Sequence, residues 1–261
     1  MDIYAITEAE GRGILDGQGV ADLLQEGADT EIKPKWDDLA RLYMLVRERK
    51  PFHILEFGSG FSTIVMASAL KQNWEECRDI LARQSGSQAV RQILYERPQM
   101  VSIESSKKWM LNTREKVEKG GLAEFTDIVF SNVSIAEYQG QVCHFYDELP
   151  DVVPDFVYMD GPDPSTVKGS INGISFKRSK RTVMSGDILK YESTLLPSFF
   201  MIVDGRTNNA RFLQRMLLRK YDVIYHKKAD VTTFQLKEPR LGIKNVFGWE
   251  AYSDLLKKNN P

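Results

Sequence analysis

Apolar residues recur at helical spacing or in short continuous runs from about residue 36 to residue 237. Over residues 36–50, leucine, tyrosine and valine side chains fall on one stripe, which predicts an amphipathic helix that Pro51 ends. Residues 53–57 form a short apolar run between Pro51 and a glycine turn, which predicts a buried strand. The next helix is expected to reach about residue 70, with Ser62 or Thr63 as its N-cap.

The same alternation continues along the chain and predicts an α/β fold. Strands are predicted at residues 100–103, 125–130, 156–159 and 199–203, and helices at residues 107–119, 188–196 and 209–218. Two last runs, residues 223–226 and 232–236, flank the turn-like sequence KKAD and predict an antiparallel hairpin. Strands that alternate with helices form a largely parallel sheet covered on both faces, here with an antiparallel edge.

Several segments depart from this minimal pattern and divide the chain. Residues 1–35 show little periodicity apart from a short helix around residues 20–25, and we interpret them as an N-terminal cap. Residues 36–237 form the main domain and residues 238–261 a tail. Within the main domain, residues 71–98 predict a helical insertion and residues 162–187 a long loop. Because such segments tolerate change most easily, we expect substrate choice or subunit contacts there.

Composition narrows the classes of function. The chain of 261 residues has a formal net charge of -1 and a pI near 6.4, so no global field gathers nucleic acid, and no nucleic-acid partner is expected. No apolar run approaches the roughly 20 residues of a membrane helix, and the N-terminus lacks the order of a signal peptide. A cytoplasmic protein without membrane contact is therefore expected. Cys77 and Cys143 are expected to be reduced thiols in or near the core.

The string HILEFGSGFST, residues 53–63, is the most informative motif. Gly58 and Gly60 follow a strand and allow a tight turn with close approach of the backbone to a ligand, because glycine lacks a Cβ atom. Such a ligand would lie at the carboxyl edge of the sheet, where the next helix begins. Thr63 occupies the place of the third glycine in the dinucleotide fingerprint, which weakens the case for NAD. A glycine turn alone can also be purely structural.

Acidic residues end other predicted strands at the same edge. Glu104, in MVSIESS, could accept two hydrogen bonds from a ribose diol, or could serve only as a helix-capping acid. It follows Glu56 by 48 residues, more than the roughly 20 of a plain βαβ unit, and the predicted insertion accounts for the difference. Asp160, in DFVYMDGPDP, could face a cofactor, an acceptor, or both. Three acids would thus surround one crevice.

With these motifs, residues 36–237 resemble the class I S-adenosylmethionine methyltransferases. ILEFGSGFST is similar to the first motif of that family, MVSIES to its ribose-binding acid strand, and FVYMDGP to its fourth-strand motif. The stretch SNVSIAEY followed by HFYDELP is similar to a bacterial branch often left unassigned. The resemblance implies a three-layer Rossmann-like sandwich with a mostly parallel seven-stranded sheet in the order 3-2-1-4-5-7-6. It also implies S-adenosyl-L-methionine as the cofactor.

The resemblance further implies roles for residues around the crevice. The bend at residues 58–60 would contact the amino-acid part of the cofactor, and Glu104 its ribose. Asp160 would lie near the sulfonium with Glu56, and is the candidate base for a hydroxyl acceptor, although orienting the cofactor fits it equally well. Asn132 and Val133 would lie at the adenine edge. The predicted cofactor site consists of Glu56, Phe57, Gly58, Ser59, Gly60, Thr63, Glu104, Ser105, Asn132, Val133 and Asp160.

Metal-dependent members of that superfamily carry an acid on the fourth strand and an Asp-Asn pair after the fifth. Here the fifth strand ends FMIVDGRTNN, so Asp204 is followed by Gly205 where the asparagine would be. One ligand is missing, and no metal is expected. The simpler expectation is that Asp204 caps the helix that begins near Thr207.

Basic residues follow the proposed reaction edge. The sequence KRSKR, which begins with Lys177 and Arg178, could clamp a phosphate, a sulfate or a carboxylated acceptor, or could be an ordinary solvated loop. Lys177, Arg178 and, after the fifth strand, Arg206 are the candidate acceptor-binding residues. His144 is expected to be a structural histidine with its hydrogen bonds satisfied, rather than a general base.

The predicted function is transfer of a methyl group from S-adenosylmethionine to an oxygen or nitrogen of a small-molecule acceptor, for which the basic loop favours an anionic one. Three alternatives stay open. An NAD-dependent dehydrogenase shares the glycine turn and the ribose acid, and an aminopropyl transferase could use an equivalent sheet. A non-catalytic nucleoside-binding protein could keep the pocket without an acceptor site. The sequence also leaves open whether the chain forms a homo-oligomer.

Overall fold

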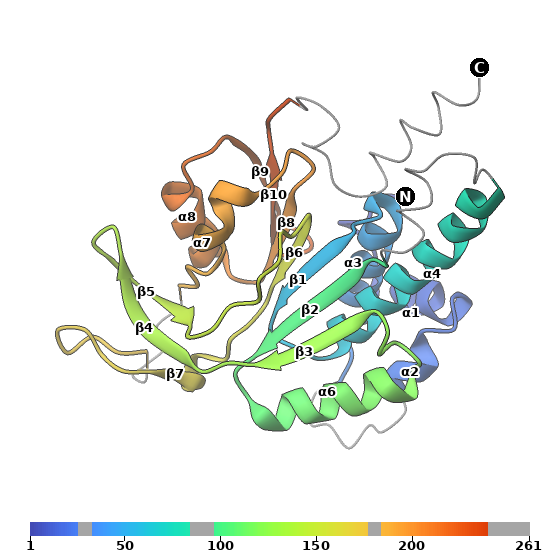
Figure 1. The fold of residues 1–261 in the computed structure, drawn as a ribbon, viewed down its shortest axis with the longest axis horizontal. Helices are drawn as coiled ribbons and strands as arrows, with labels where there is room; N and C mark the ends of the chain where they lie inside the picture. The colour runs from blue at the N-terminus through green and yellow to red at the C-terminus, as the bar shows by residue number, and fades with distance from the viewer. Residues whose placement is uncertain (26–32, 84–96, 177–183, 240–261) are drawn as a thin grey trace.

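A seven-stranded sheet forms the centre of the protein, in a computed structural model that describes residues 1–25, 33–83, 97–176 and 184–239 (Figure 1). Its order is β3-β2-β1-β6-β8-β10-β9, and only β9 and β10 at one edge are antiparallel to their neighbours. Counted along the chain, these strands have the order 3-2-1-4-5-7-6, so the predicted fold is confirmed. The strands are β1 (His53–Phe57), β2 (Gln99–Glu104), β3 (Thr126–Phe130), β6 (Phe156–Met159), β8 (Phe200–Asp204), β9 (Tyr221–His226) and β10 (Val231–Leu236).

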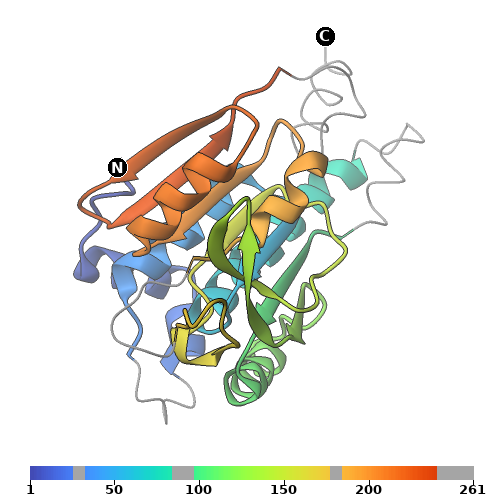
Figure 2. The same ribbon diagram turned by 90° about the vertical axis from the view of Figure 1, so that its left-hand side faces the viewer.

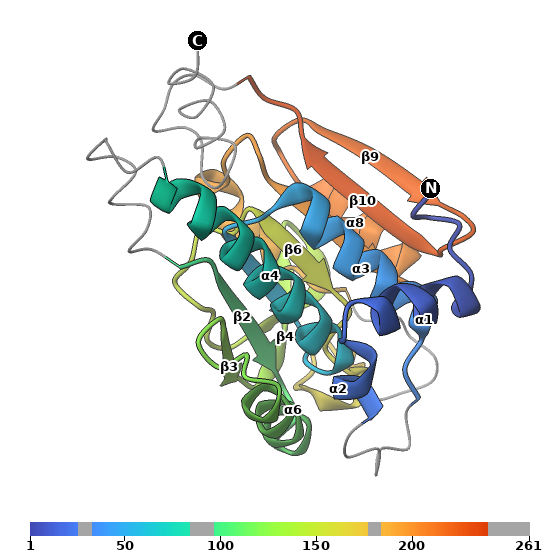
Figure 3. The same cartoon turned by 90° about the vertical axis from the view of Figure 1, so that its right-hand side faces the viewer.

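Helices cover both faces of this sheet. On one face, α3 (Trp36–Arg49) and α4 (Phe61–Arg83) lie side by side, with α6 (Lys107–Lys119) next to α4 (Figure 3). On the other face lie the short α7 (Ile188–Tyr191), the 3-10 turn η2 (Glu192–Thr194) and α8 (Thr207–Met216) (Figure 2). Because both faces are covered, the strands read as continuous apolar runs, and two separate cores form, one on each side. No helix in the described ranges is long and apolar enough to cross a membrane.

The N-terminal segment is more regular than its sequence pattern indicated. It forms α1 (Glu8–Gly17) as well as the expected short α2 (Ala21–Gln25), and α1 packs against α3. Thr7 and Glu10 form a capping box at the start of α1, in which the Thr7 side chain accepts from the Glu10 amide and Glu10 accepts from the Thr7 amide. This T-x-x-E sequence was the available signal for a helix. Because only one narrow stripe of α1 is buried, the helix has few apolar residues, and the sequence shows no clear hydrophobic periodicity there.

The helix after β1 is also longer than expected. It continues without a break from Phe61 to Arg83, so residues 71–83 extend α4 and do not begin a separate insertion. Residues 84–96, the rest of the predicted insertion, lie outside the described residues. Ser62 and Thr63 do not cap this helix, because they lie inside its first turn and their hydroxyls donate to Glu56. The prediction of a helix end near residue 70 is therefore wrong.

A second, three-stranded sheet was not expected. It has the order β5-β4-β7, with β4 (Val133–Tyr138), β5 (Gln141–Tyr146) and the two-residue β7 (Val167–Lys168), which follows the 3-10 turn η1 (Pro164–Thr166). Gln139 and Gly140 join β4 to β5 with φ angles of 48° and 74°, as a two-residue hairpin turn of type I′ requires. Figures 1 and 2 show this sheet on the same side as α7 and α8. It carries His144 and Tyr146 into the buried region beside the strand ends.

Candidate functional site

The glycine bend after β1 is built by a close approach of two backbones. Gly58 has a φ of +110° and donates from its amide to the Ile103 carbonyl at 2.9 Å. A Cβ placed on Gly161, after β6, would lie 2.8 Å from Gly58 Cα and from the Phe57 carbonyl oxygen, so no other residue fits there. A Cβ on Gly60 would meet no atom within 4 Å. The bend is thus tightly held on the side of β6 and open at Gly60.

Glu104 lies directly beside this bend. Its Oε2 accepts a hydrogen bond from Ser59 Oγ at 3.0 Å, and its Oε1 accepts from the Ser106 amide at 2.8 Å. Its side chain is 8% exposed. The structure therefore brings together the two predicted parts of the cofactor site, the bend and the acid at the end of β2. Since a carboxylate has about four lone-pair positions, Glu104 keeps the capacity to accept further hydrogen bonds from a ligand.

Glu56 is held by hydroxyl groups of α4 and β2. Its carboxylate accepts three hydroxyl hydrogen bonds, from Ser62 at 2.5 Å, Thr63 at 2.6 Å and Ser102 at 2.5 Å, and the residue is 1% exposed. Burial raises the pKa of Glu56 to about 7, although these hydroxyls oppose the rise. Glu56 fixes the first turn of α4 against β1 and β2, and its place beside a cofactor stays a prediction.

Asp160 ends β6 and remains open to solvent. Its side chain is 60% exposed, and Oδ1 lies 4.0 Å from Arg206 Nε. The surrounding protein limits the hydration of the Asp160 carboxylate and raises its pKa, while the charge of Arg206 opposes this shift. Arg206 also donates to the backbone carbonyls of Asp160 and Pro162. The guanidinium therefore holds the loop after β6, and its predicted contact with an acceptor stays a prediction.

Asp204 does not cap α8, so that prediction is wrong. The N-cap residue of α8 is Arg206, and no side chain caps this helix end. Asp204 instead accepts a hydrogen bond from the Tyr158 hydroxyl at 2.8 Å. Burial and the neighbouring charge of Asp160 raise the pKa of Asp204 to about 6. At the end of β8, beside Asp160, the Asp204 carboxylate could accept either from the first amides of α8 or from the buried Tyr158 phenol. It accepts from the phenol.

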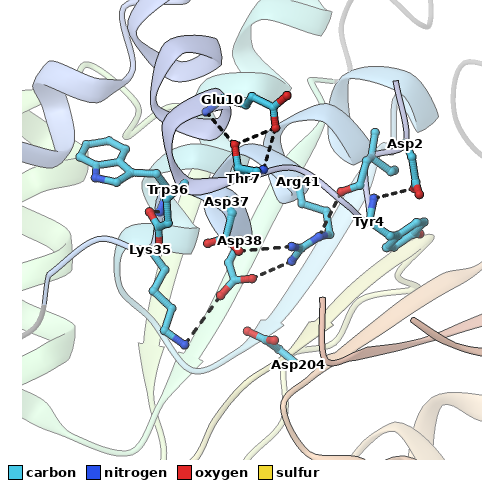
Figure 4. Close-up of polar contacts among 12 residues, drawn as sticks. Asp2, Tyr4, Thr7, Glu10, Lys35, Trp36, Asp37, Asp38, Arg41 and Asp204 are labelled. Atoms are coloured by element: carbon cyan, nitrogen blue, oxygen red, sulfur yellow. Dashed lines mark hydrogen bonds and ion pairs between the residues drawn. The ribbon is translucent and has the colours of Figure 1, made fainter. Parts of the chain in front are cut away.

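The start of α3 lies over these strand ends (Figure 4). Arg41, 2% exposed, pairs with Asp38 at 2.7 Å and donates to the Ile3 carbonyl at 3.2 Å, which ties the N-terminal segment to α3. Asp38 adds to the raised pKa of both Asp160 and Asp204, and Figure 4 shows Asp204 beside the Asp38–Arg41 pair. Helix α3, held by the N-terminal segment, thus contributes charged groups beside the ends of β6 and β8.

The predicted adenine edge lies between β3 and β7. The exposed Asn132 accepts through Oδ1 from Lys168 Nζ at 2.7 Å, and Ser105 shares a hydrogen bond of 2.9 Å with Thr166. Val133 is fully buried and its strand is paired on both sides, so its side chain offers no surface to a ligand. Within this edge, only the Asn132 and Ser105 side chains are placed where a ligand can reach them.

Two further predictions concern the basic sequence KRSKR and the absence of a metal. Lys177 and Arg178, with the rest of the KRSKR sequence, lie outside the described residues. Among the residues that the structure does describe, no three histidine, cysteine, aspartate or glutamate side chains gather as a metal site would require. Whether the protein uses a metal therefore stays a prediction.

His144 and Tyr146 on β5 are both buried. His144 was expected to have its hydrogen bonds satisfied, but within the described residues neither ring nitrogen has a hydrogen-bond partner, and Nδ1 lies 4.0 Å from Asp187 Oδ2. Burial and, to a lesser degree, the charge of Arg206 lower the pKa of His144 to about 3, so the imidazole is neutral near pH 7. Tyr146 is 1% exposed, and its hydroxyl is also unpartnered. The turn at Gln139 and Gly140 was the available signal for this strand and its partner β4.

No family model matches the chain, and no curated protein matches its sequence. Solved structures with a similar arrangement include an SAH-bound methyltransferase from Podospora anserina, with 14% identity and a TM-score of 0.46 over 86% of this chain and 88% of that one. The O-methyltransferase TomG from Streptomyces achromogenes, in complex with SAM, has 14% identity and a TM-score of 0.45 over 84% and 90%. A putative O-methyltransferase from Klebsiella pneumoniae has 14% identity and a TM-score of 0.47 over 89% and 98%. Similarity at this level carries no conclusion about ligand or activity.

Proposed function

We propose that this protein is an S-adenosylmethionine-dependent methyltransferase that acts on an oxygen or nitrogen of a small molecule. The observation that carries the proposal is the 3.0 Å contact between Ser59 Oγ and Glu104 Oε2. It joins a glycine bend and a strand-end carboxylate at the carboxyl edge of two neighbouring parallel strands, which is where nucleoside ligands bind in sheets of this kind. The motif resemblance over residues 36–237 supports the same cofactor.

The residues present fit such a nucleoside. Glu104 can accept hydrogen bonds from two ribose hydroxyls, because its two oxygens retain free lone pairs beside the Ser59 and Ser106 donors. The space beside Gly60 leaves room for the ligand where the backbone turns into α4. The amino-terminal end of α4, a helix of 23 residues, would favour the carboxylate of the amino-acid part through its free amides and its dipole.

When bound, the cofactor would supply a methyl group on a sulfonium centre and leave as the thioether. The protein then has to align the acceptor and, for a hydroxyl acceptor, remove its proton. Asp160 is exposed at the end of β6, and its raised pKa makes it a better base than an ordinary aspartate. The described groups around Asp160 include the carboxylates of Asp38 and Asp204. The cations of Arg206 and Lys35 also act on Asp160, so an anionic acceptor draws its support from Arg206 and from the basic sequence that begins at Lys177.

One feature speaks against the dehydrogenase alternative. The third glycine of a dinucleotide motif allows close packing of helix and strand, and Thr63 stands in its place. Thr63 is fully buried, and its hydroxyl donates to Glu56. The side chain is therefore built into the packing between β1 and α4.

Calorimetry tests this proposal. The wild-type protein should bind S-adenosylmethionine and S-adenosylhomocysteine but not NAD. Glu104→Gln keeps the size of the side chain and removes its charge, so we expect binding to weaken about 10- to 100-fold, since hydrogen bonds to charged groups contribute roughly 1.5–3 kcal/mol. Glu137→Gln, at an exposed position of β4, is the matched control and should bind as the wild type does. Preferential binding of NAD, or equal affinities in Glu104→Gln and wild type, would refute the assignment.

A further inference from the structure

The inner end of β5 carries buried polar atoms that have no hydrogen-bond partner among the residues that the structure describes. His144 and Tyr146 are two residues apart in one strand, so their side chains lie on the same face. Both His144 ring nitrogens and the Tyr146 hydroxyl are buried without a hydrogen bond. A buried polar atom without a partner costs about 1–3 kcal/mol, and native proteins contain few of them. His144 Nδ1 lies 4.0 Å from Asp187 Oδ2, so the Tyr146 hydroxyl is the atom of this face that, within the described residues, keeps a hydrogen bond to donate to a group from outside the chain.

Tyr146 lies next to the nucleoside end of the proposed site. Its ring stacks on Phe57, with ring centroids 6.0 Å apart and an interplanar angle of 27°, and Phe57 directly precedes Gly58. The Tyr146 amide donates to Asp187 Oδ1 at 2.8 Å, and Tyr146 pairs with Val133 in the β4–β5 ladder. Both backbone contacts fix the direction of the side chain toward the end of β1.

Electrostatics place Glu104 near the same hydroxyl. Burial raises the pKa of the Tyr146 phenol, and Glu104 is the charged group that adds most to this rise. The hydroxyl therefore stays protonated and can donate a hydrogen bond. Ser59 donates to Glu104 Oε2, and the remaining lone pair of this oxygen can accept from a ribose hydroxyl.

We propose that the Tyr146 hydroxyl is a nucleoside-binding group, which donates a hydrogen bond to the ribose of the ligand whose diol Glu104 accepts. This inference rests on the proposed function and extends its site to the second sheet. It also gives β4 and β5 a role, since their hairpin positions a polar side chain that the main sheet does not supply.

The test is Tyr146→Phe, which removes the hydroxyl and keeps the ring stacked on Phe57. We expect its dissociation constant for S-adenosylhomocysteine to rise about tenfold. Methylthioadenosine, which lacks the amino-acid part, should lose the same factor, because the contact is to the ribose. The melting temperature of the ligand-free variant should be unchanged or higher, because no hydrogen bond within the protein is lost. In a cycle with Glu104→Gln, the two effects should be non-additive, because both side chains meet one ribose.

Tyr191→Phe is the matched control. Tyr191 is also buried, but its hydroxyl donates to the Pro150 carbonyl at 2.7 Å, so the substitution should lower the melting temperature and leave the affinity unchanged. Equal affinity of Tyr146→Phe and wild type for S-adenosylhomocysteine would overturn the inference, whatever its melting temperature. A loss confined to S-adenosylhomocysteine, with methylthioadenosine bound normally, would overturn the assignment to the ribose. If the wild type binds neither compound, the proposed function itself fails.

Discussion

Gly161→Ala should push apart the loop after β1, which contains Gly58, and the loop after β6, which contains Gly161. The added Cβ would lie 2.8 Å from Gly58 Cα, Gly58 N and the Phe57 carbonyl oxygen, all of which are backbone atoms that cannot rotate away. Overpacking of this kind costs about 1–3 kcal/mol, and the reduced freedom of the unfolded chain offsets about 0.4–1 kcal/mol of it. We therefore expect a net loss of about 1–2 kcal/mol in the free energy of unfolding, or roughly 2–8 °C in melting temperature.

The same substitution should also weaken binding, because Gly58 can only yield by shifting the bend that lies beside Glu104. Thermal denaturation and calorimetry with S-adenosylhomocysteine measure the two effects on one preparation. Gly60→Ala is the contrasting variant, since its Cβ meets nothing within 4 Å and should leave the melting temperature unchanged while it narrows the space for the ligand. The reasoning fails if Gly161→Ala melts and binds as the wild type does.

Two further predictions concern stability. Gly11→Ala would place a Cβ 2.4 Å from the Trp36 carbonyl oxygen and push α1 from α3, at a cost of about 1–3 kcal/mol in the free energy of unfolding. Gly13→Ala, at an exposed position of the same helix, should instead stabilise the protein by about 0.5–1 kcal/mol. Urea denaturation that gives the same sign for both variants would contradict this. The pKa of Glu56 is raised to about 7 from 4.5, so its contribution to stability is fully present below pH 4.5 and is lost as the pH rises through 7. Denaturation at pH 4.5 and pH 8 should therefore show about 3 kcal/mol less pH dependence in Glu56→Gln than in wild type, and equal dependence would exclude this titration.

The periodicity of apolar residues in the sequence was sufficient to predict the strands of the main sheet. The strands at residues 53–57 and 156–159 have the predicted bounds, as does the helix at residues 107–119, because each is a continuous apolar run or a regular stripe between clear turn residues. The hairpin of β9 and β10 was also predicted from alternation and the KKAD turn. Local pattern decides these elements, since each must bury its apolar side against the same core.

The second sheet escaped prediction because its strands do not follow this rule. β4 and β5 are only partly covered, so their residues mix polar and apolar types, and the Gln139–Gly140 turn was the only local signal. The length of α4 was misjudged for a related reason. Polar residues from 71 onward interrupt its apolar stripe, although the helix continues.

The sequence alone determined which residue types stand at the strand ends, and so indicated an acidic, glycine-lined crevice with a nucleoside as its expected ligand. Only the tertiary structure decided how these side chains are used. Glu56 turns inward to three hydroxyls, Glu104 meets Ser59, and Asp204 bonds Tyr158 in place of a helix end. Ser102, Ser59 and Tyr158 are distant in the chain from the acids that they contact. Such contacts depend on the packing of whole elements, which local periodicity does not encode.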